Sequence, residues 1–371
     1  MPQTLAPYEP IPPGELLLEE ITARGWTQSD FAAITRRPLQ TINEIISGKK
    51  AITPETSLAF ARALGTTPQY WLNLESAYRL ALARRNKSID EDISRRSRIY
   101  SQVPVNELLR RQWIKVKDRN NVDELEKSVC DFLEISSIDQ KPNCIAAARR
   151  AGDEGLNTAH IAWFFRVKHV ARTESAGPYS KATLKRHLET LRNLCASEEA
   201  TKNVKETLAG LGVRFVIVEH LPQTKIDGGS LWLDEESPVV ALSLRYDRLD
   251  YFWFTLMHEI AHILHEDCRT SKRFIVDEGI VGQDAGGNEG SNEIEKRANR
   301  DAAQWLIDRT ELEAFINRQG RYFSVASIRD FAAKMKAHPA IVVGQLQYRK
   351  AVPWTHFRGM LVKIKPVLLV N

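Results

Sequence analysis

His258, Glu259 and His262 are the residues whose types and spacing are best suited to chemistry. Histidines four apart on a helix lie on one face, a turn apart, so both imidazoles can bind one metal ion. The glutamate beside the first histidine lies about 100° around the helix, where it can act as general base on a metal-bound water. This H-E-x-x-H spacing predicts Zn2+ binding and peptide hydrolysis. The alternative is a pair of core histidines bonded to nearby backbone.

The segment that must position these residues, 249–266, is predicted to be a buried helix. Its apolar residues recur at helical spacing and form one broad face. Histidine and glutamate side chains inside such a helix need partners, because unsatisfied polar groups are costly there. The residues of the apolar face are Leu249, Phe252, Trp253, Leu256, Ile260, Ile263 and Leu264.

A zinc site of this kind needs a third protein ligand and one open position for water. The next predicted helix, 291–307, offers Glu295 on a face that is otherwise small and apolar. Asn299, one turn beyond Glu295, is suited to orient a ligand histidine. Glu293 falls on the polar face of the same helix and is excluded as a ligand.

Other assignments stay open. Glu295 also has the spacing of a capping-box partner for Asn292, and the thiolate of Cys268 could bind zinc. A further donor should stabilise the oxyanion that forms during hydrolysis. The candidates for that donor are Arg245, Tyr246, Tyr251 and His338.

Three stretches before the helix, 213–221, 230–236 and 238–244, read as strands. Strands followed by an H-E-x-x-H helix fit the zincin arrangement, in which a small sheet packs on the active-site helix. An edge strand of that sheet can bind an extended peptide by strand addition. The Gly-rich segment 266–291 is predicted to be a flap over the site.

The N-terminal part of the chain predicts a bundle of short helices. A proline-rich arm, 1–12, precedes it. Thr27, Thr53 and Thr67 are placed to cap helices, and Gly25 and Gly48 to end them. The predicted helices run over 15–25, 27–37, 39–47, 54–65 and 68–85.

A tight turn between the second and third of these helices predicts a helix-turn-helix DNA-binding domain. The third helix would turn Leu39, Ile42, Ile45 and Ile46 to the core and lie in the major groove. An all-helical protein-binding module is the alternative. The residues expected to meet base edges are Gln40, Thr41, Asn43 and Glu44, and those expected near phosphates are Arg36, Arg37, Lys49 and Lys50.

The middle of the chain is predicted to be helical. The Arg- and Lys-rich stretch 84–119 reads as a linker that passes into a helix over 103–114. His160, His169 and His187 stand alone in later helices, so packing or surface roles are expected for them. Further helices are expected over 122–134, 157–173, 181–195 and 203–212.

Composition fits a cytoplasmic protein. No apolar run approaches the roughly 18 residues that a membrane span requires, and no secretory signal is visible at the start. A net charge of +5 permits contact with nucleic acid. The cysteines are scattered and are expected to be reduced thiols; they are Cys130, Cys144, Cys195 and Cys268.

Residues 10–85, with the run ISGKKAITPE and the ending YWLNLESAY, resemble the XRE-type domain of HigA-type antitoxins. The resemblance implies a homodimer on a palindromic double-stranded DNA operator, often with a cognate toxin as partner. Residues 205–310 resemble an ImmA/IrrE-type metallopeptidase domain, which implies a site made of His258, Glu259, His262 and Glu295. One departure is RDAAQWLID after Ala-Asn, where relatives often have Phe-Ala and a later proline.

The sequence therefore predicts a multidomain, mainly α protein that joins a five-helix helix-turn-helix domain to an α+β zincin-like domain. The first hypothesis is a repressor or antitoxin, nucleoid-associated when bound to DNA, whose peptidase domain senses or cleaves a protein. The second is an active zinc protease delivered to DNA-bound or self substrates, and the third is a non-catalytic toxin-binding scaffold. The expected regions are an arm (1–12), the DNA-binding domain (13–85), a helical linker region (86–205) and the zincin-like domain (206–371).

Overall fold

The chain divides into two compact units, Met1–Arg95 and Arg96–Asn371, and each has a buried core of its own. Most of the predicted N-terminal arm, 1–9, falls outside the described residues. The computed structural model describes residues 10–84, 87–142, 148–150, 157–267, 269, 274–278 and 293–369.

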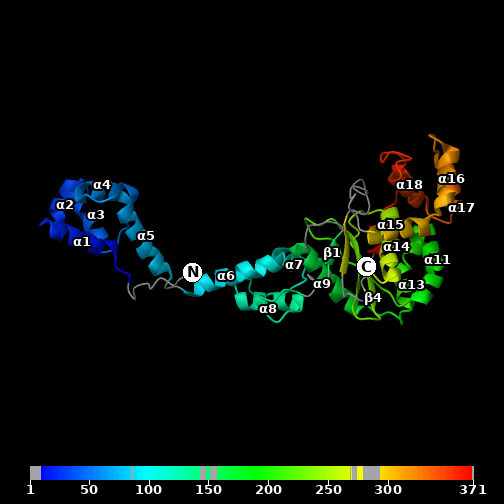
Figure 1. Cartoon of the computed structure of the whole chain (residues 1–371), viewed down its shortest axis with the longest axis horizontal. Coiled ribbons are helices and arrows are strands. Elements are labelled where there is room, and N and C mark those ends of the chain that lie inside the picture. The colour runs from blue at the N-terminus through cyan, green and yellow to red at the C-terminus, as the bar shows by residue number, and fades with distance from the viewer. Residues whose placement is uncertain are drawn as a thin grey trace. The chain divides into compact units, whose positions relative to one another are not determined.

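The five predicted N-terminal helices are present in the first unit as α1 to α5 (Figure 1). The Thr27 hydroxyl accepts a hydrogen bond from the backbone N–H of Asp30, whose carboxylate accepts from the backbone N–H of Thr27. Arg36 is left-handed, with φ 53° and ψ 40°, and ends the second helix. Phe31 and Phe60 pack in the core with ring centroids 5.2 Å apart. The helices are α1 (Pro13–Ala23), α2 (Gln28–Thr35), α3 (Leu39–Ile46), α4 (Pro54–Leu64) and α5 (Pro68–Arg84).

The stretch 84–119 is more helical than expected: α6 (Lys87–Gln102) was not predicted, whereas α7 (Val105–Arg110) lies within the helix expected over 103–114. Its high content of Arg and Lys reflects a solvated helix face, because Lys and Arg favour helix as well as solvent. The opposite face carries apolar residues that belong to a core. Fully buried among them are Ile99, Val103, Val105 and Leu108.

A five-stranded sheet lies at the centre of the second unit, in the order β1-β5-β3-β4-β2. β3 is antiparallel to both β4 and β5, whereas β2 runs parallel to β4 and β1 parallel to β5. The three predicted strands are present, but β3 starts at Ile226 rather than at 230. The strands are β1 (Ala148–Arg150), β2 (Arg214–Ile217), β3 (Ile226–Trp232), β4 (Pro238–Leu242) and β5 (Phe274–Glu278).

The strands β1 and β5 were not expected. β5 falls inside the segment predicted to be a flap, most of whose other residues lie outside the described part of the chain. β3 has a neighbour on each side, and the edges of the described sheet are β1 and β2.

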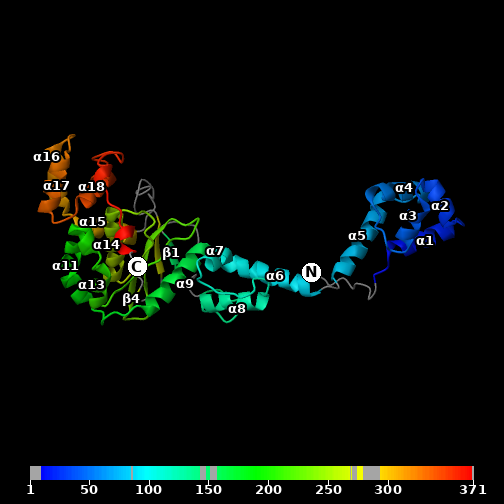
Figure 2. The same cartoon turned by 180° about the vertical axis from the view of Figure 1, so that it is seen from behind.

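Helices cover both faces of the sheet, and Figures 1 and 2 show them on opposite sides. On one face α8 (Val122–Leu133) and α9 (Thr158–Thr173) share a core with Val216 and Val239. The region predicted to be a helical linker therefore supplies one layer of the second unit. On the other face lie α13 (Val204–Gly210) and α14 (Leu249–His265).

The remaining helices surround α14. α15 and α18 pack directly on α14, and α17 packs on α18. The helix expected over 181–195 is divided at His187, where φ is −95° and ψ is 7°. No helix in the described residues is both long and apolar enough to cross a membrane. These helices are α10 (Lys181–Arg186), α11 (Leu188–Asn193), α12 (Glu198–Thr201), α15 (Glu293–Leu306), α16 (Arg309–Gln319), α17 (Val325–Lys334), α18 (Pro339–Tyr348) and α19 (Lys365–Leu368).

Candidate metal centre and nucleic-acid interface

The helix α14 positions the H-E-x-x-H residues. Apolar side chains bury it on nearly every side, and His258, Glu259 and His262 are themselves fully buried. α14 ends where Glu266 takes a left-handed conformation, with φ 59° and ψ 29°. This reversal lets the backbone N–H of Asp267 bond to the carbonyl of His262 at 3.2 Å. Asp267 is thereby brought back beside the last turn of the helix.

Glu295 on α15 reaches the two histidines. Its Oε2 lies 3.3 Å from Nε2 of His258 and 3.5 Å from Nε2 of His262, and the two Nε2 atoms lie 3.0 Å apart. Among the described residues this trio is the group of histidine, cysteine and acidic side chains arranged to hold a metal ion. Small residues on α15, Ala298 and Ala302, are fully buried and allow the close approach of the two helices.

The outer nitrogens of both histidines are held by oxygen acceptors. Nδ1 of His258 lies 3.0 Å from Oδ1 of Asn299, and Nδ1 of His262 lies 2.9 Å from Oδ2 of Asp267. An Nδ1–H that donates to such an oxygen leaves the Nε2 lone pair as an acceptor. Two Nε2 lone pairs and a carboxylate oxygen then face one point. That donor set fits a cation such as Zn2+, which binds imidazole and carboxylate.

Electrostatics agree with this arrangement. Burial opposes ionisation of Glu295, but the two imidazoles beside its carboxylate outweigh burial and hold its pKa well below the usual value. For Asp267, too, burial is outweighed by hydrogen bonds, here from His262 and Arg297, which lower the pKa. Arg297 Nη2 lies 2.5 Å from Oδ1 of Asp267. Both carboxylates are therefore anionic at neutral pH.

Glu259 lies against the backbone of β3. A Cβ atom at Gly228 would come within 2.5 Å of Oε1 of Glu259 and 2.7 Å of Cγ2 of Thr255. Glycine is therefore required at 228 for the strand to pass this close to α14. β3 has a bulge between Ile226 and Gly228 at the same place.

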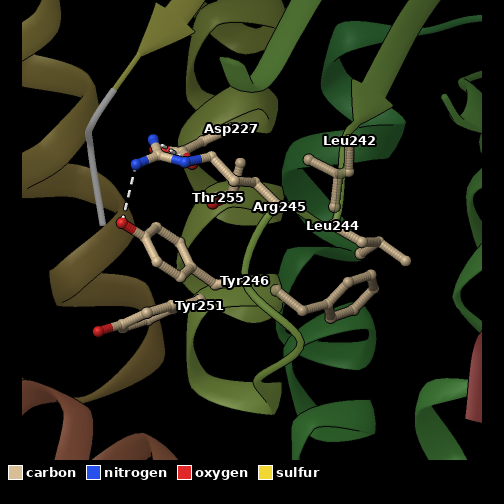
Figure 3. Close-up of a pocket in the computed structure, with 8 residues that line it drawn as sticks. Asp227, Leu242, Leu244, Arg245, Tyr246, Tyr251 and Thr255 are labelled. Atoms are coloured by element: carbon tan, nitrogen blue, oxygen red, sulfur yellow. Dashed lines mark hydrogen bonds and ion pairs between the residues drawn. The ribbon is translucent and has the colours of Figure 1, made fainter. Parts of the chain in front are cut away.

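A hollow lies one helical turn from Glu259. Thr255 lines the hollow, and the same threonine would be contacted by a Cβ atom at Gly228. Three oxyanion candidates, Arg245, Tyr246 and Tyr251, line the same hollow (Figure 3). His338 instead caps α18, where its Nδ1 accepts from the backbone N–H of Ala340 at 3.1 Å.

The structure describes one of the three other residues that bear on the choice of ligands, Glu293. Glu293 is exposed and pairs with Lys296 at 3.1 Å, as expected for the polar face. Asn292 and Cys268 lie outside the described residues. Two residues of the site were missed by sequence reasoning, Asp267 and Gly228. The signals for them were an acid just beyond the second histidine and a glycine pair inside a strand.

The histidines expected to have packing or surface roles each contact a nearby oxygen. Nε2 of buried His160 lies 2.5 Å from Oε1 of Glu278, which joins α9 to the end of β5. His169 faces Glu134 at 3.4 Å, and His187 Nδ1 lies 3.0 Å from the carbonyl of Thr183.

The candidate nucleic-acid interface is the exposed side of α3 and its flanks. Gln40 donates to Glu44 at 2.9 Å, and Nζ of Lys50 lies 3.6 Å from Glu44 and 3.4 Å from the hydroxyl of Thr41. These contacts gather four of the predicted DNA-binding residues into one polar network. Ile42 and Ile45 are buried as predicted, but Leu39 is 43% exposed, which corrects its assignment to the core.

The other predicted DNA-contacting residues lie at the two ends of α3. Arg36 and Arg37 precede it in the turn, and Lys49 and Lys50 follow it. Arg36, Asn43 and Lys49 are exposed, whereas Arg37 is half-buried. Cationic side chains at both ends of a helix with a polar outer face suit a duplex whose phosphates flank the groove.

Comparisons with known proteins match both halves of the chain. Residues 17–71 match the helix-turn-helix family, and residues 212–338 match the IrrE N-terminal-like domain. A curated relative, the uncharacterized HTH-type transcriptional regulator YddM of Escherichia coli, is 31% identical over 90 residues, which is 24% of this chain and 92% of the relative. Virulence-associated protein I of Dichelobacter nodosus is 36% identical over 78 residues, 21% of this chain and 72% of that protein.

Solved structures match a similar share of the chain. An addiction module antidote protein of the HigA family from Coxiella burnetii is 36% identical, with 22% of this chain and 94% of that chain covered and a TM-score of 0.21. The Pseudomonas aeruginosa antitoxin HigA, solved with the higBA promoter, is 29% identical, with the same coverages and a TM-score of 0.22.

Proposed function

Because the chain belongs to the family of helix-turn-helix regulators and carries an IrrE-like peptidase domain, we propose that it is a transcriptional repressor or antitoxin with a zinc metallopeptidase domain. The DNA-binding unit holds the protein on its operator. The peptidase domain senses or cleaves a protein and so links that event to transcription.

The observation that carries the peptidase half is the convergence of three ligand atoms from two helices. His258 and His262 present Nε2, and Glu295 presents Oε2, within 4.8 Å of one another. Asn299 and Asp267 fix the rings from outside. Ligand histidines whose outer ring nitrogens are hydrogen-bonded, and whose inner nitrogens converge with a carboxylate oxygen, are typical of a metal centre.

His258, His262 and Glu295 would hold the zinc ion. When bound there, zinc would supply Lewis-acid polarisation of the scissile carbonyl and a bound water whose pKa is lowered to about 7. Glu259, one residue from a ligand, takes the proton of the attacking water and passes it to the leaving amine. Arg245 or a tyrosine of the hollow donates to the carbonyl oxygen as negative charge develops there.

The DNA-binding half rests on α3. Gln40, Thr41, Asn43 and Glu44 would meet base edges, whereas Arg36, Arg37, Lys49 and Lys50 would meet phosphates. A homodimer on a palindromic operator follows from the two-fold symmetry of such sites. A cognate toxin is the expected protein partner, and the cytoplasm, with the nucleoid when DNA is bound, the expected location.

Two measurements test this proposal separately. A mobility-shift assay with the DNA upstream of its own gene should show a salt-sensitive complex; the regulator half fails if no fragment shifts. Incubation of the zinc-loaded chain with its toxin or with itself should give fragments that disappear in Glu259→Gln. An identical fragment pattern in that variant would mean that the chain is not the protease.

A further inference from the structure

The described sheet has two edges to which an extended peptide could add, β1 at one end and β2 at the other. The β2 end lies on the apolar side of α14. Leu256 and Ile260 of α14 are buried in a core that also contains Phe215 of β2 and Leu208 of α13. A substrate beside the metal centre would have to reach the sheet from the other side of α14.

The candidate metal ligands face the end of the sheet where β5 and β1 lie. Glu259 lies against β3, and successive residues of a helix are turned by about 100°. Measured from Glu259, His258 and His262 are turned about 100° and about 60° to one side. Leu256 and Ile260 are turned about 60° and about 100° to the other side, towards the core shared with β2. The metal centre therefore lies on the side of α14 that faces β5.

The outer edge of β5 is the place for an extended substrate. β5 lies between β3 and β1, and neighbouring strands are about 4.8 Å apart, so the outer edge of β5 is one such spacing nearer to β3 than that of β1. A peptide that reaches the metal centre by strand addition would pair with β5. In the structure residues 148–150 of the chain itself take that position, opposite residues 274–276.

β1 is held less firmly than β5. It has three residues and one partner in the described sheet, to which it runs parallel, so it makes few hydrogen bonds. β5 pairs with β3 on its other side. At its end, Oε1 of Glu278 accepts from the backbone N–H of Lys225 at 3.2 Å and lies 2.5 Å from Nε2 of His160. β1 can therefore leave while β5 stays in place.

We propose that β1 is an autoinhibitory strand, which occupies the edge of β5 where a substrate peptide adds in extended form. The inference rests on the proposed metallopeptidase function and adds to it how the site is regulated. A substrate must displace residues 148–150 before it reaches the metal centre. Because a strand is recognised through its backbone groups, an extended segment is favoured over the surface of a folded domain.

The test removes backbone donors from β1 and leaves β5 unchanged. Successive N–H groups of a strand point to opposite sides, so Arg149→Pro together with Arg150→Pro removes at least one donor to β5. Arg149→Gln together with Arg150→Gln is the matched control, because it removes the same two charges and keeps both N–H groups.

Hydrogen exchange measured by mass spectrometry reports on this edge without zinc or substrate. In the proline variant, the amides of residues 274–278 that β1 protects should exchange about tenfold faster than in the wild type and the glutamine variant. Residues 226–232 of β3, which pair with β4 and β5, are the internal control and should not change. Equal exchange of residues 274–278 in all three proteins overturns the proposal.

Binding of a probe measures the cost of displacing β1. N-acetyl-Val-Ala-Val hydroxamate joins an extended peptide to a zinc-binding group, and its affinity for the zinc-loaded full chain is measured by titration calorimetry. If β1 occupies the edge in about 90% of molecules, its release raises the apparent affinity about tenfold. The proline variant should show this gain and the glutamine variant should not. Equal affinities in the three proteins overturn the proposal.

The wild type alone gives a second answer, which does not depend on how a variant folds. The bound probe takes the place of β1, so it should increase deuterium uptake by residues 148–150 while residues 274–278 stay protected. The same peptide methylated at its backbone nitrogens cannot donate to β5 and should change neither segment. Saturation with the probe that leaves uptake by residues 148–150 unchanged overturns the proposal.

Zinc content separates this result from a failure of the proposed function. A chain that holds zinc but binds the probe equally in the three proteins loses the autoinhibitory strand and keeps the metal centre. A chain that holds no zinc loses both.

Discussion

His262 donates from Nδ1 to Oδ2 of Asp267 at 2.9 Å, and Asp267 in turn pairs with Arg297 of α15. The contact exists because α14 reverses at Glu266 and returns the chain to its own last turn. It links one candidate ligand to the helix that supplies another. The two histidines also differ, since His258 bonds to the neutral amide of Asn299 and His262 to a carboxylate.

Replacing Asp267 should weaken metal binding. Asp267→Ala removes the acceptor that orients His262, and loss of such a contact typically costs about 10–100-fold in metal affinity. Competition with a chromophoric chelator measures the change. Asp301→Asn is the matched control, because Asp301 makes a similar contact to His265, at 2.7 Å, outside the trio. Equal metal affinities in Asp267→Ala and Asp301→Asn would mean that Asp267 does not support metal binding through His262.

Gly228→Ala should destabilise the second unit. The added Cβ would lie 2.5 Å from Oε1 of Glu259 and 2.7 Å from Cγ2 of Thr255, so these buried side chains or the strand itself must shift. Overpacking of this kind costs about 1–3 kcal/mol in the free energy of unfolding, measured by urea denaturation. Gly210→Ala, at a glycine with no heavy atom within 4 Å of an added Cβ, is the control and should lose no stability.

Glu134 should make a pH-dependent contribution to stability. Burial opposes its ionisation, but hydrogen bonds from Lys168 and Arg172 outweigh burial and lower its pKa. A lowered folded-state pKa stabilises the native state above the unfolded value, about 4.3 for Glu. That stability is lost as the pH falls through the folded pKa.

The corresponding measurement compares Glu134→Gln with the wild type by denaturation at several pH values. The variant should be less stable by about 1 kcal/mol at pH 7, and the difference should vanish in acid. Glu199→Gln, at a side chain that is 81% exposed, should show little difference at any pH. If Glu134→Gln loses the same free energy of unfolding at every pH, the ionised carboxylate of Glu134 is not the source of this stability.

DNA-contacting residues should separate into two classes. Lys49→Ala should weaken binding to all sequences alike and reduce the slope of affinity against salt by about one. Glu44→Ala should instead relax specificity at one base pair, by about 1–3 kcal/mol. Binding to a panel of single-base operator variants at several salt concentrations distinguishes them. If Glu44→Ala loses the same affinity for every operator variant, Glu44 does not read a base pair.

Local patterns were enough to predict much of this fold. The five N-terminal helices follow from capping threonines and helix-ending residues near each other in sequence, and α14 from an apolar face that surrounds two histidines. The face of α15 that carries Glu295 and Asn299 was also visible in its periodicity. These features depend on residues within a few turns of one another.

Features that depend on tertiary contacts were missed. α6 has a charged composition, and the role of its buried residue Ile99, and of Val103 just after the helix, follows only from the core that they join. β5 is short and pairs with β3, more than forty residues earlier in the chain. Asp267 contacts His262 only because the chain reverses at Glu266. None of these follows from the period of a single segment.

If His258, His262 and Glu295 form one metal centre, the zinc content of the protein depends on Glu295. Mass spectrometry of the wild type, Glu295→Ala and Glu293→Ala compares two glutamates on the same helix, one in the trio and one exposed. About one zinc per chain is expected for the wild type and Glu293→Ala, with a clear loss in Glu295→Ala. No zinc in the wild type purified without chelators, or equal zinc in all three proteins, would mean that these three residues do not form a metal centre.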